Sequence, residues 1–274
     1  MQNAGLYSIL ALICNMRIFF LFLLFIQLSA VAQQYQWKLV WADEFSYKGL
    51  PDSFKWNYNT GGHGWGNNEL QYYTKANLNN ARVEKGNLVI EARKETVGSN
   101  NYTSARLSTK GKGDWKNGRI EVRAKIPKGI GTWPAIWMLA STTPLRWPDD
   151  GEIDIMEHVG HNPGFIHFSI HTKKFNHIIG TQKTDTLYMP NAIKSFHVYA
   201  MQWDEQTMHW FVDGKQVFEI TNDGTGKDAW PFNQPFFLIL NIAVGGNWGG
   251  QKGVDETIFP QRMLIDYVRV YQKK

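Results

Sequence analysis

The ten residues from Gly151 to Gly160, GEIDIMEHVG, carry three carboxylates, Glu152, Asp154 and Glu157, within an apolar run. Two carboxylates about 5 Å apart at an effective dielectric near 20 repel each other by roughly 3 kcal/mol, which corresponds to about two pKa units. Such repulsion raises the pKa of one glutamic acid towards neutrality while its neighbour stays ionised. A proton donor facing a carboxylate is the pair that cleavage of a glycosidic bond requires.

The local backbone decides whether these three carboxylates can meet. On an α-helix, at about 100° per residue, Glu152 and Glu157 would lie roughly 140° apart. On a regular strand Glu152 and Asp154 share a face, whereas Glu157 points to the other side. A β-bulge near Ile155 and Met156 corrects the parity and returns Glu157 to the face of its partners. We therefore predict a bulged strand; a solvent-facing strand edge, on which acids only maintain solubility, is the alternative.

Alternation of apolar and polar residues recurs along the chain, and helical periodicity is scarce. This pattern predicts strands over 86–93, 118–126, 165–171, 196–203 and 262–271. Asp213 and Gly214 separate two further alternating stretches and are typical of a type I′ hairpin turn. Because the connections are rich in Gly, Asn and Pro and no strands alternate with helices, we predict an all-β fold of two packed antiparallel sheets.

An N-terminal segment stands apart from this fold. Arg17 precedes an apolar block, Ile18 to Gln27, and small residues that suit a cleavage site. This is the pattern of a secretory signal, and the block is shorter than the roughly 20 residues that span a bilayer. We expect residues 1–32 to be a signal peptide, with Met16 as an alternative start, and residues 33–274 to form one domain without a membrane span.

The amino-acid composition limits the kinds of molecule that we expect the protein to bind. Cys14, the only cysteine, lies in the N-terminal segment, so the exported chain has no disulfide and no thiol chemistry. Without Arg17 the 29 Lys and Arg fall to 28 against 24 Asp and Glu, a net charge of +4 with no basic run. We therefore expect no nucleic-acid partner. The 12 Trp and 11 Tyr favour a surface that stacks on flat apolar faces, such as those of pyranose rings.

The segment from Glu152 to Glu157 resembles the E-x-D-x-x-E signature of glycoside hydrolase family 16, in the bulged form of its laminarinase-like members. The likeness continues through WADEF (41–45), GWGNNELQYYT (64–74), YTSARLSTKGK (102–112), GTWPAIWML (131–139), NIAVGGNWGG (241–250) and DYVRVY (266–271). It therefore covers nearly all of the mature chain. The resemblance implies a β-jelly-roll sandwich, similar to concanavalin A, with a substrate cleft on its concave face.

The resemblance also implies a reaction. Glu152 would be the nucleophile, Glu157 the acid/base, and Asp154 the group that tunes the nucleophile. The implied protein is a secreted, periplasmic or extracellular, monomeric endo-β-1,3-glucanase. It would cut internal bonds of laminarin-type β-glucans by double displacement, without a cofactor for catalysis. Two alternatives remain open: the same chemistry on mixed-linkage β-1,3-1,4-glucan or a marine galactan, and a non-catalytic β-glucan-binding module.

The positions that the resemblance assigns to substrate binding are Asn67, Arg106, Trp133, Trp137, Trp147, His171, Asn241 and Trp248. The tryptophans would stack on sugars, with burial in the core as the alternative. His171 would bond substrate or tune the acid/base, with a surface histidine as the alternative. His167 and His171 cannot hold one metal ion, because alternate strand positions place them about 13 Å apart.

The family also implies a structural calcium ion. The corresponding positions are Glu44, the Gly86 backbone and Asp266. Oxygen ligands of this kind suit Ca²⁺. A misassigned strand face at Asp266 is the alternative.

Overall fold

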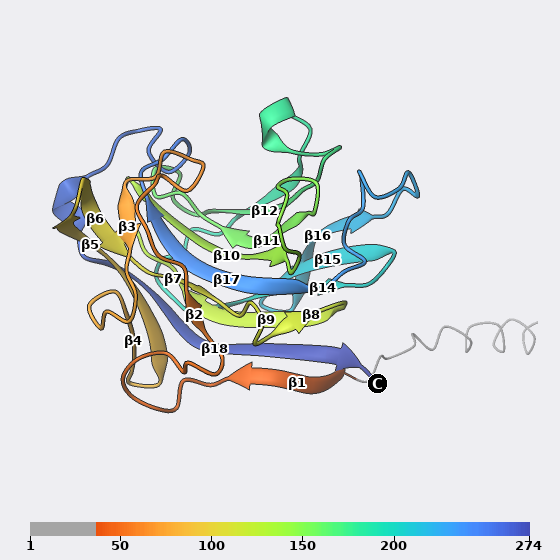
Figure 1. The fold of residues 1–274 in the computed structure, drawn as a ribbon, viewed down its shortest axis with the longest axis horizontal. Coiled ribbons are helices and arrows are strands. Elements are labelled where there is room, and N and C mark those ends of the chain that lie inside the picture. Colours follow the sequence, from red (N-terminus) through yellow and green to blue (C-terminus); the bar gives the residue numbers. More distant parts are fainter. Residues whose placement is uncertain (1–36) are drawn as a thin grey trace, which may run out of the picture. The chain divides into compact units, whose positions relative to one another are not determined.

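A computed structural model describes residues 37–274, so the expected signal peptide lies outside the described residues. Residues 38–272 form one unit whose regular elements are almost all β-strands (Figure 1). Two short 3₁₀ helices interrupt them, η1 (His177–Ile179) and η2 (Glu256–Ile258). Over the described residues, no helix has the length and apolar character needed to cross a membrane.

The first sheet has ten strands, eight of them in the order β16-β15-β14-β9-β18-β5-β6-β3, with β1 beside β18 and β4 beside β5. Their bounds are β1 (Trp37–Asp43), β3 (Gln71–Tyr73), β4 (Ala81–Glu84), β5 (Asn87–Val97), β6 (Asn100–Ser104), β9 (Gly118–Lys125), β14 (His197–Trp203), β15 (Thr207–Val212), β16 (Lys215–Thr221) and β18 (Gln261–Lys273). Strands β3 and β6 are parallel, whereas the other pairs with a resolved register are antiparallel.

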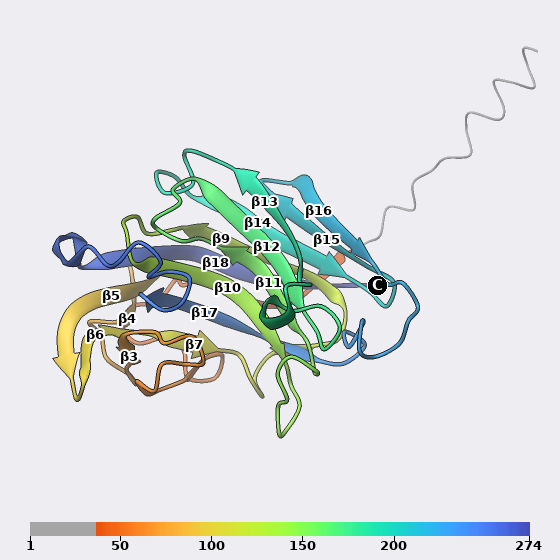
Figure 2. The same ribbon diagram turned by 90° about the horizontal axis from the view of Figure 1, so that it is seen from above.

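The second sheet has eight strands, seven of them in the order β13-β12-β11-β10-β17-β7-β2, with β8 beside β17. Their bounds are β2 (Asn57–Tyr58), β7 (Arg106–Ser108), β8 (Asp114–Trp115), β10 (Thr132–Ala140), β11 (Glu152–Glu157), β12 (Phe165–His171), β13 (Lys183–Tyr188) and β17 (Phe236–Val244). Figure 2 shows this sheet lying over the first.

Alternating residues of both sheets fill one hydrophobic core. In β9 the buried residues Ile120, Val122 and Ala124 alternate with partly exposed charged ones, as the sequence predicts. The same core contains residues of β11, β12 and β17 from the facing sheet. Burying a side chain of this size contributes about 1.5–3 kcal/mol. The core therefore holds the eight-stranded sheet by one face and leaves its other face available.

The predicted elements are found where alternation is strong. Strand β12 covers the predicted range 165–171, and β9, β14, β18 and β5 match the other predicted strands to within a few residues. Asp213 and Gly214 have φ values of 50° and 80°, as a type I′ turn between β15 and β16 requires. The predicted all-β fold of two packed, mainly antiparallel sheets is confirmed.

Candidate active site

Strand β11 contains the predicted bulge. Between Asp154 and Glu157 its register against β12 shifts by one residue, and its register against β10 shifts at the same place. The two residues between them, Ile155 and Met156, are both fully buried. Glu157 therefore returns to the face of Glu152, and the two glutamates line the same cleft. The prediction of a bulged strand is confirmed.

An indole N–H group orients each glutamate. Trp147 Nε1 donates to Glu152 Oε2 at 3.0 Å, and Trp133 Nε1 donates to Glu157 Oε1 at 2.9 Å. A hydrogen bond to a charged group contributes about 1.5–3 kcal/mol, and it favours the ionised form of the acceptor. Each carboxyl therefore has one oxygen held by a tryptophan and one left for other partners.

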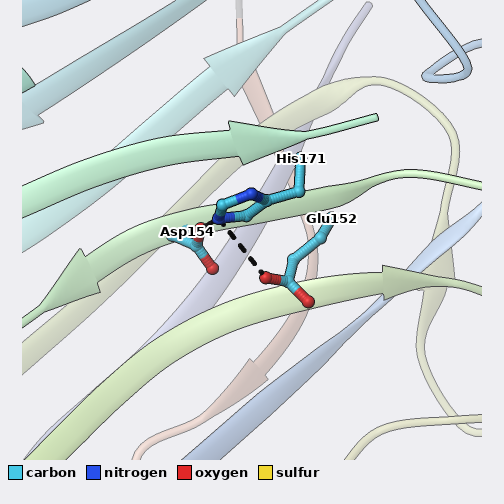
Figure 3. A group of neighbouring side chains, drawn as sticks. All are labelled: Glu152, Asp154 and His171. Carbon is cyan, nitrogen blue, oxygen red and sulfur yellow. Dashed lines mark ion pairs between the residues drawn. The ribbon is translucent and has the colours of Figure 1, made fainter. Parts of the chain in front are cut away.

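His171 lies beside two of the three carboxylates. It is the register partner of Glu152 on β12. Its Nε2 is 3.8 Å from Glu152 Oε1 and 3.4 Å from Asp154 Oδ2, and Figure 3 shows the imidazole reaching over both carboxyl groups. The structure thus places His171 next to Glu152, the predicted nucleophile, and next to Asp154.

The carboxyl groups are hard to ionise together. The pKa of each of the three carboxyl groups is raised to about 8, chiefly by burial, and for the two glutamates the charge of Asp154 adds to that rise. Glu152 has three groups that favour its anion, namely Trp147, His171 and the guanidinium of Arg106. Trp133 and His171 favour the anion of Glu157. Both glutamates thus have a pKa of about 8, and Glu152 has the larger number of groups that favour its anion.

On one side of the carboxylates lies a hollow that we call the tryptophan half of the cleft. It extends over β10, β17 and β7, and its lining includes Trp65, Arg106, Trp137 and Asn241. The guanidinium carbon of Arg106 lies 4.6 Å from the ring centres of both Trp65 and Trp137. Cation–π contacts of this kind contribute about 2 kcal/mol each when they are desolvated. They hold both rings at fixed positions.

A chain of hydrogen bonds supports the floor of the tryptophan half. Trp137 Nε1 donates to Asn241 Oδ1 at 2.7 Å, Asn241 Nδ2 donates to the Tyr73 hydroxyl at 3.0 Å, and that hydroxyl donates to Glu69 Oε2 at 3.4 Å. Asn67 Nδ2 donates to Glu69 Oε1 at 3.4 Å. Asn67, Trp137 and Asn241, three predicted substrate-binding residues, therefore belong to one network.

On the other side of the carboxylates lies the hydroxyl half of the cleft, over β12 and β13. Its lining includes Ser169, His171, Gln182, Thr184 and Thr186. Trp248 forms a wall, because its ring contacts the ring of Trp133 at 5.4 Å and the ring of His167 at 4.8 Å. The two halves share Asn67, Trp133, Glu152 and Glu157. The glutamates thus stand at the junction of a cleft that continues to both sides.

The structure brings all eight predicted substrate-binding residues to this region. Trp147 reaches it through its bond to Glu152, and its ring also contacts that of His177 at 5.2 Å. Three further residues line the cleft that the sequence analysis did not predict, Trp65, Glu69 and His177. The first two lie in the GWGNNEL segment, which is rich in the Gly and Asn typical of turns, and no local pattern distinguishes His177 in η1.

The predicted calcium ligands come from neighbouring parts of the ten-stranded sheet. Asp266 follows Ile265, whose register partner is Leu88 in β5, and Gly86 lies in the turn before β5. Glu44 follows β1, which also pairs with β18. The three segments thus meet along one strand, as a shared site requires.

Both calcium-site carboxylates are paired with arginine. Arg269 donates to the two oxygens of Glu44 at 2.7 and 2.9 Å, and Arg123 Nη1 donates to Asp266 Oδ2 at 2.6 Å. A calcium ion needs six to eight oxygen ligands and would displace both guanidinium groups. As placed, these side chains do not form a calcium site. Calcium stays a prediction, which a chelator-sensitive melting temperature would support.

Known proteins resemble this chain over most of its length. The family model described as "Glycosyl hydrolases family 16" matches residues 68–269. The "Beta-glucanase" of Rhodothermus marinus is 55% identical over 244 residues, which cover 86% of this chain and 85% of that protein.

Solved structures of similar proteins superpose on most of this chain. The laminarinase from Rhodothermus marinus superposes with a TM-score of 0.86 at 52% identity, covering 88% of this chain and all of that one. SCLam, described as a non-specific endo-β-1,3(4)-glucanase, gives a TM-score of 0.83 at 51% identity, with 87% and 92% covered. The predicted β-jelly-roll sandwich is thereby confirmed.

Proposed function

The chain belongs to glycosyl hydrolase family 16 and is a glycoside hydrolase, and we propose that it is an endo-β-1,3-glucanase (laminarinase) acting on internal bonds of laminarin-type β-glucans. One observation carries the proposal: the bulge of β11 places Glu152 and Glu157 together at the middle of the cleft. The names of the similar β-glucanase and laminarinase support the choice of substrate.

An endo mode of attack follows from the two halves of the cleft. A polysaccharide that is cut internally needs sugar-binding surface on both sides of the scissile bond. The tryptophan half offers indole rings and the hydroxyl half offers Ser, Thr and Gln side chains. Indole faces stack on pyranose rings, whereas hydroxyl and amide groups bond sugar hydroxyls. We assign the tryptophan half to the glycone and the hydroxyl half to the aglycone.

The first step of the proposed reaction forms a covalent intermediate. The Glu152 carboxylate attacks the anomeric carbon as the bond from that carbon to the glycosidic oxygen breaks. Glu157 gives its proton to that oxygen, and the reducing-end segment leaves as an alcohol. The Asp154 carboxyl and the His171 imidazole adjust the charge of Glu152; His171 Nε2 lies 3.8 Å from Glu152 Oε1 and 3.4 Å from Asp154 Oδ2.

The second step releases the sugar and restores the enzyme. Glu157, now ionised, removes a proton from water, whose oxygen attacks the anomeric carbon and displaces Glu152. Two inversions give net retention. Retention is therefore the expected stereochemical outcome, and proton NMR of the anomeric signals during early hydrolysis would show it.

Substitution of Glu152 tests the assignment. Glu152→Gln keeps the side-chain volume and an acceptor for Trp147 but removes the nucleophile, so turnover should vanish while the fold persists by circular dichroism. Glu205→Gln is a matched control, since Glu205 lies on an exposed loop and pairs only loosely with Lys116 at 3.5 Å. Substantial activity in Glu152→Gln would reject the role.

The choice of glucan is tested separately. SCLam is described as a non-specific endo-β-1,3(4)-glucanase, so mixed-linkage glucan is the second candidate substrate. Reducing-sugar release should be measured on laminarin, curdlan, lichenan, agarose and carrageenan. Greater release from laminarin than from the other polysaccharides supports the proposal. A preference for lichenan supports the mixed-linkage alternative, and release from agarose or carrageenan supports a galactan as the substrate. Binding without any release would indicate a glucan-binding module.

We further propose that residues 33–274 form a single catalytic domain and that residues 1–32 direct its export to the periplasm or the medium. Support comes from the apolar block before the cleavage site and from the family match, which begins at residue 68. N-terminal sequencing of the exported protein should give a start near Gln33. Light scattering after gel filtration should give the mass of a monomer.

A further inference from the structure

Three donor atoms converge at the middle of the cleft without bonding to one another. Glu152 Oε1, Asp154 Oδ2 and His171 Nε2 come from β11 and β12, and the ligand atoms of this group lie within 4.8 Å of one another (Figure 3). The contacts of 3.8 and 3.4 Å exceed the 2.7–3.2 Å typical of a hydrogen bond. Asp154 Oδ2 has no hydrogen-bond partner, although Asp154 is only 2% exposed.

This spacing fits the ligands of one transition-metal ion. Two donors about 2.1 Å from a zinc ion, at the tetrahedral angle, lie roughly 3.4 Å apart. One imidazole and two carboxylates form a donor set that zinc uses, and the nitrogen ligand favours zinc over calcium or magnesium. We propose that Glu152, Asp154 and His171 bind one Zn²⁺ ion reversibly and that the bound ion inhibits hydrolysis.

The surroundings leave the site accessible and oriented. Trp147 holds Glu152 Oε2, so Oε1 is the oxygen directed at the imidazole. Glu152 and His171 both line the cleft, through which an ion and its remaining water ligands can enter. His171 Nδ1 has no hydrogen-bond partner, and loss of such an outer partner typically costs about 10- to 100-fold in metal affinity. Zn²⁺ would therefore exchange with solvent and not reside permanently.

Inhibition follows from the identity of the ligands. A Glu152 oxygen bound to Zn²⁺ no longer attacks the anomeric carbon, and the ion occupies space at the junction of the two halves. Substrate and ion then exclude each other, so Zn²⁺ should raise the apparent KM for laminarin and a chelator should reverse the effect. This inhibitory part rests on the proposed function, whereas ion binding does not.

Binding is measured first, on the full mature chain without a histidine tag and after chelator treatment. Isothermal titration with Zn²⁺ should show a single site, and Co²⁺ should give the visible absorption of a low-symmetry protein site. His171→Asn, which keeps a polar side chain of similar reach, should abolish the cobalt spectrum, and so should His171→Ala. His167→Ala is the matched control, because His167 lines the same cleft outside the cluster and its loss should leave Zn²⁺ binding unchanged.

The outcomes separate the two proposals. Equal Zn²⁺ affinity in the wild type and both His171 variants, or absence of binding at millimolar Zn²⁺, overturns the site. Hydrolysis of laminarin with an apparent KM that Zn²⁺ does not change overturns the inhibition and leaves the proposed function standing. A His171-dependent zinc site in a protein that hydrolyses no β-glucan supports the site and rejects the function.

Discussion

Replacing Trp147 with phenylalanine should narrow the pH range of activity from its acidic side. The substitution removes the indole N–H group that donates to Glu152 Oε2 at 3.0 Å and keeps an aromatic ring in the same place. Glu152 must be ionised to attack, and this bond favours its anion. Without the bond the pKa of Glu152 rises, so the acidic limb of the pH profile moves to higher pH.

The size of this shift follows from the strength of the bond. A hydrogen bond to a charged acceptor contributes about 1.5–3 kcal/mol, and one pKa unit corresponds to about 1.36 kcal/mol. The upper bound is therefore about two units. The Glu152 side chain is 15% exposed, so water replaces part of the lost donor. We expect a shift of about one unit in the acidic limb.

Trp133 provides the matched control, because its indole donates to the other glutamate at 2.9 Å. Trp133→Phe raises the pKa of Glu157 in the same way. Glu157 must be protonated to act as the acid, so here the alkaline limb moves to higher pH and the range widens. The KM also rises, since Trp133 lines both halves of the cleft.

The assay is kcat/KM for a soluble laminari-oligosaccharide across the acidic to alkaline range, since this ratio reports ionisations of the free enzyme. The expected pattern is one limb per variant. A Trp147→Phe profile that moves at its alkaline limb would mean that Glu152 is the proton donor and Glu157 the nucleophile. Unchanged limbs in both variants would refute the claim that the indoles set the pKa values.

Three further predictions concern stability and binding. Asp154→Asn should become more stable relative to the wild type as the pH rises from about 5 to about 9. Burial raises the Asp154 pKa to about 8 in the folded protein, whereas the unfolded value is near 3.9. The stabilising contribution of the Asp154 carboxyl is therefore complete below about pH 3.9 and is lost as the pH rises through about 8. Urea unfolding at both pH values measures this. Arg106→Met should lower the free energy of unfolding by about 3 kcal/mol and raise KM, because two cation–π contacts are lost; urea unfolding and initial rates measure both. Gly160→Ala should lower that free energy by about 3 kcal/mol, because its Cβ would lie 1.7 Å from the Gly129 carbonyl oxygen and the turn after β11 must move; urea unfolding shows this too.

Alternation predicted the strands that have one polar face and missed those that have none. Strand β9 alternates because its outward side chains are charged, and its range was predicted almost to the residue. All nine residues of β17 are buried, since its outer face forms the floor of the cleft and carries further apolar cover. A continuous apolar run does not distinguish such a strand from a buried helix. The parallel pairing of β3 with β6 involves short segments without a pattern.

Some features of the candidate site follow from residues that are neighbours in the sequence, and others depend on residues that are far apart in it. The parity argument for Glu157 needs only six consecutive residues, and so the sequence was sufficient for it. The sandwich of Arg106 between Trp65 and Trp137 unites three segments about 30 residues or more apart, and periodicity contains no information on such pairings. The arginine partners of Glu44 and Asp266 are likewise set by sheet register, which the sequence of either strand alone does not reveal.

The bulge buries the apolar residues and exposes the acids of β11 to the cleft, which a regular strand cannot do at the same time. With strict alternation after Asp154, Met156 would face the cleft and Glu157 would enter the core. An unpaired carboxylate in an apolar core costs several kcal/mol, and exposing Met156 would forfeit about 1.5–3 kcal/mol of burial. One extra residue buries both Ile155 and Met156 completely and turns Glu157 to the cleft, at the cost of a locally disrupted ladder, about 1 kcal/mol per lost bond. The apolar pair between the acids therefore makes the irregular backbone the stable one, and the geometry of the site follows from the core.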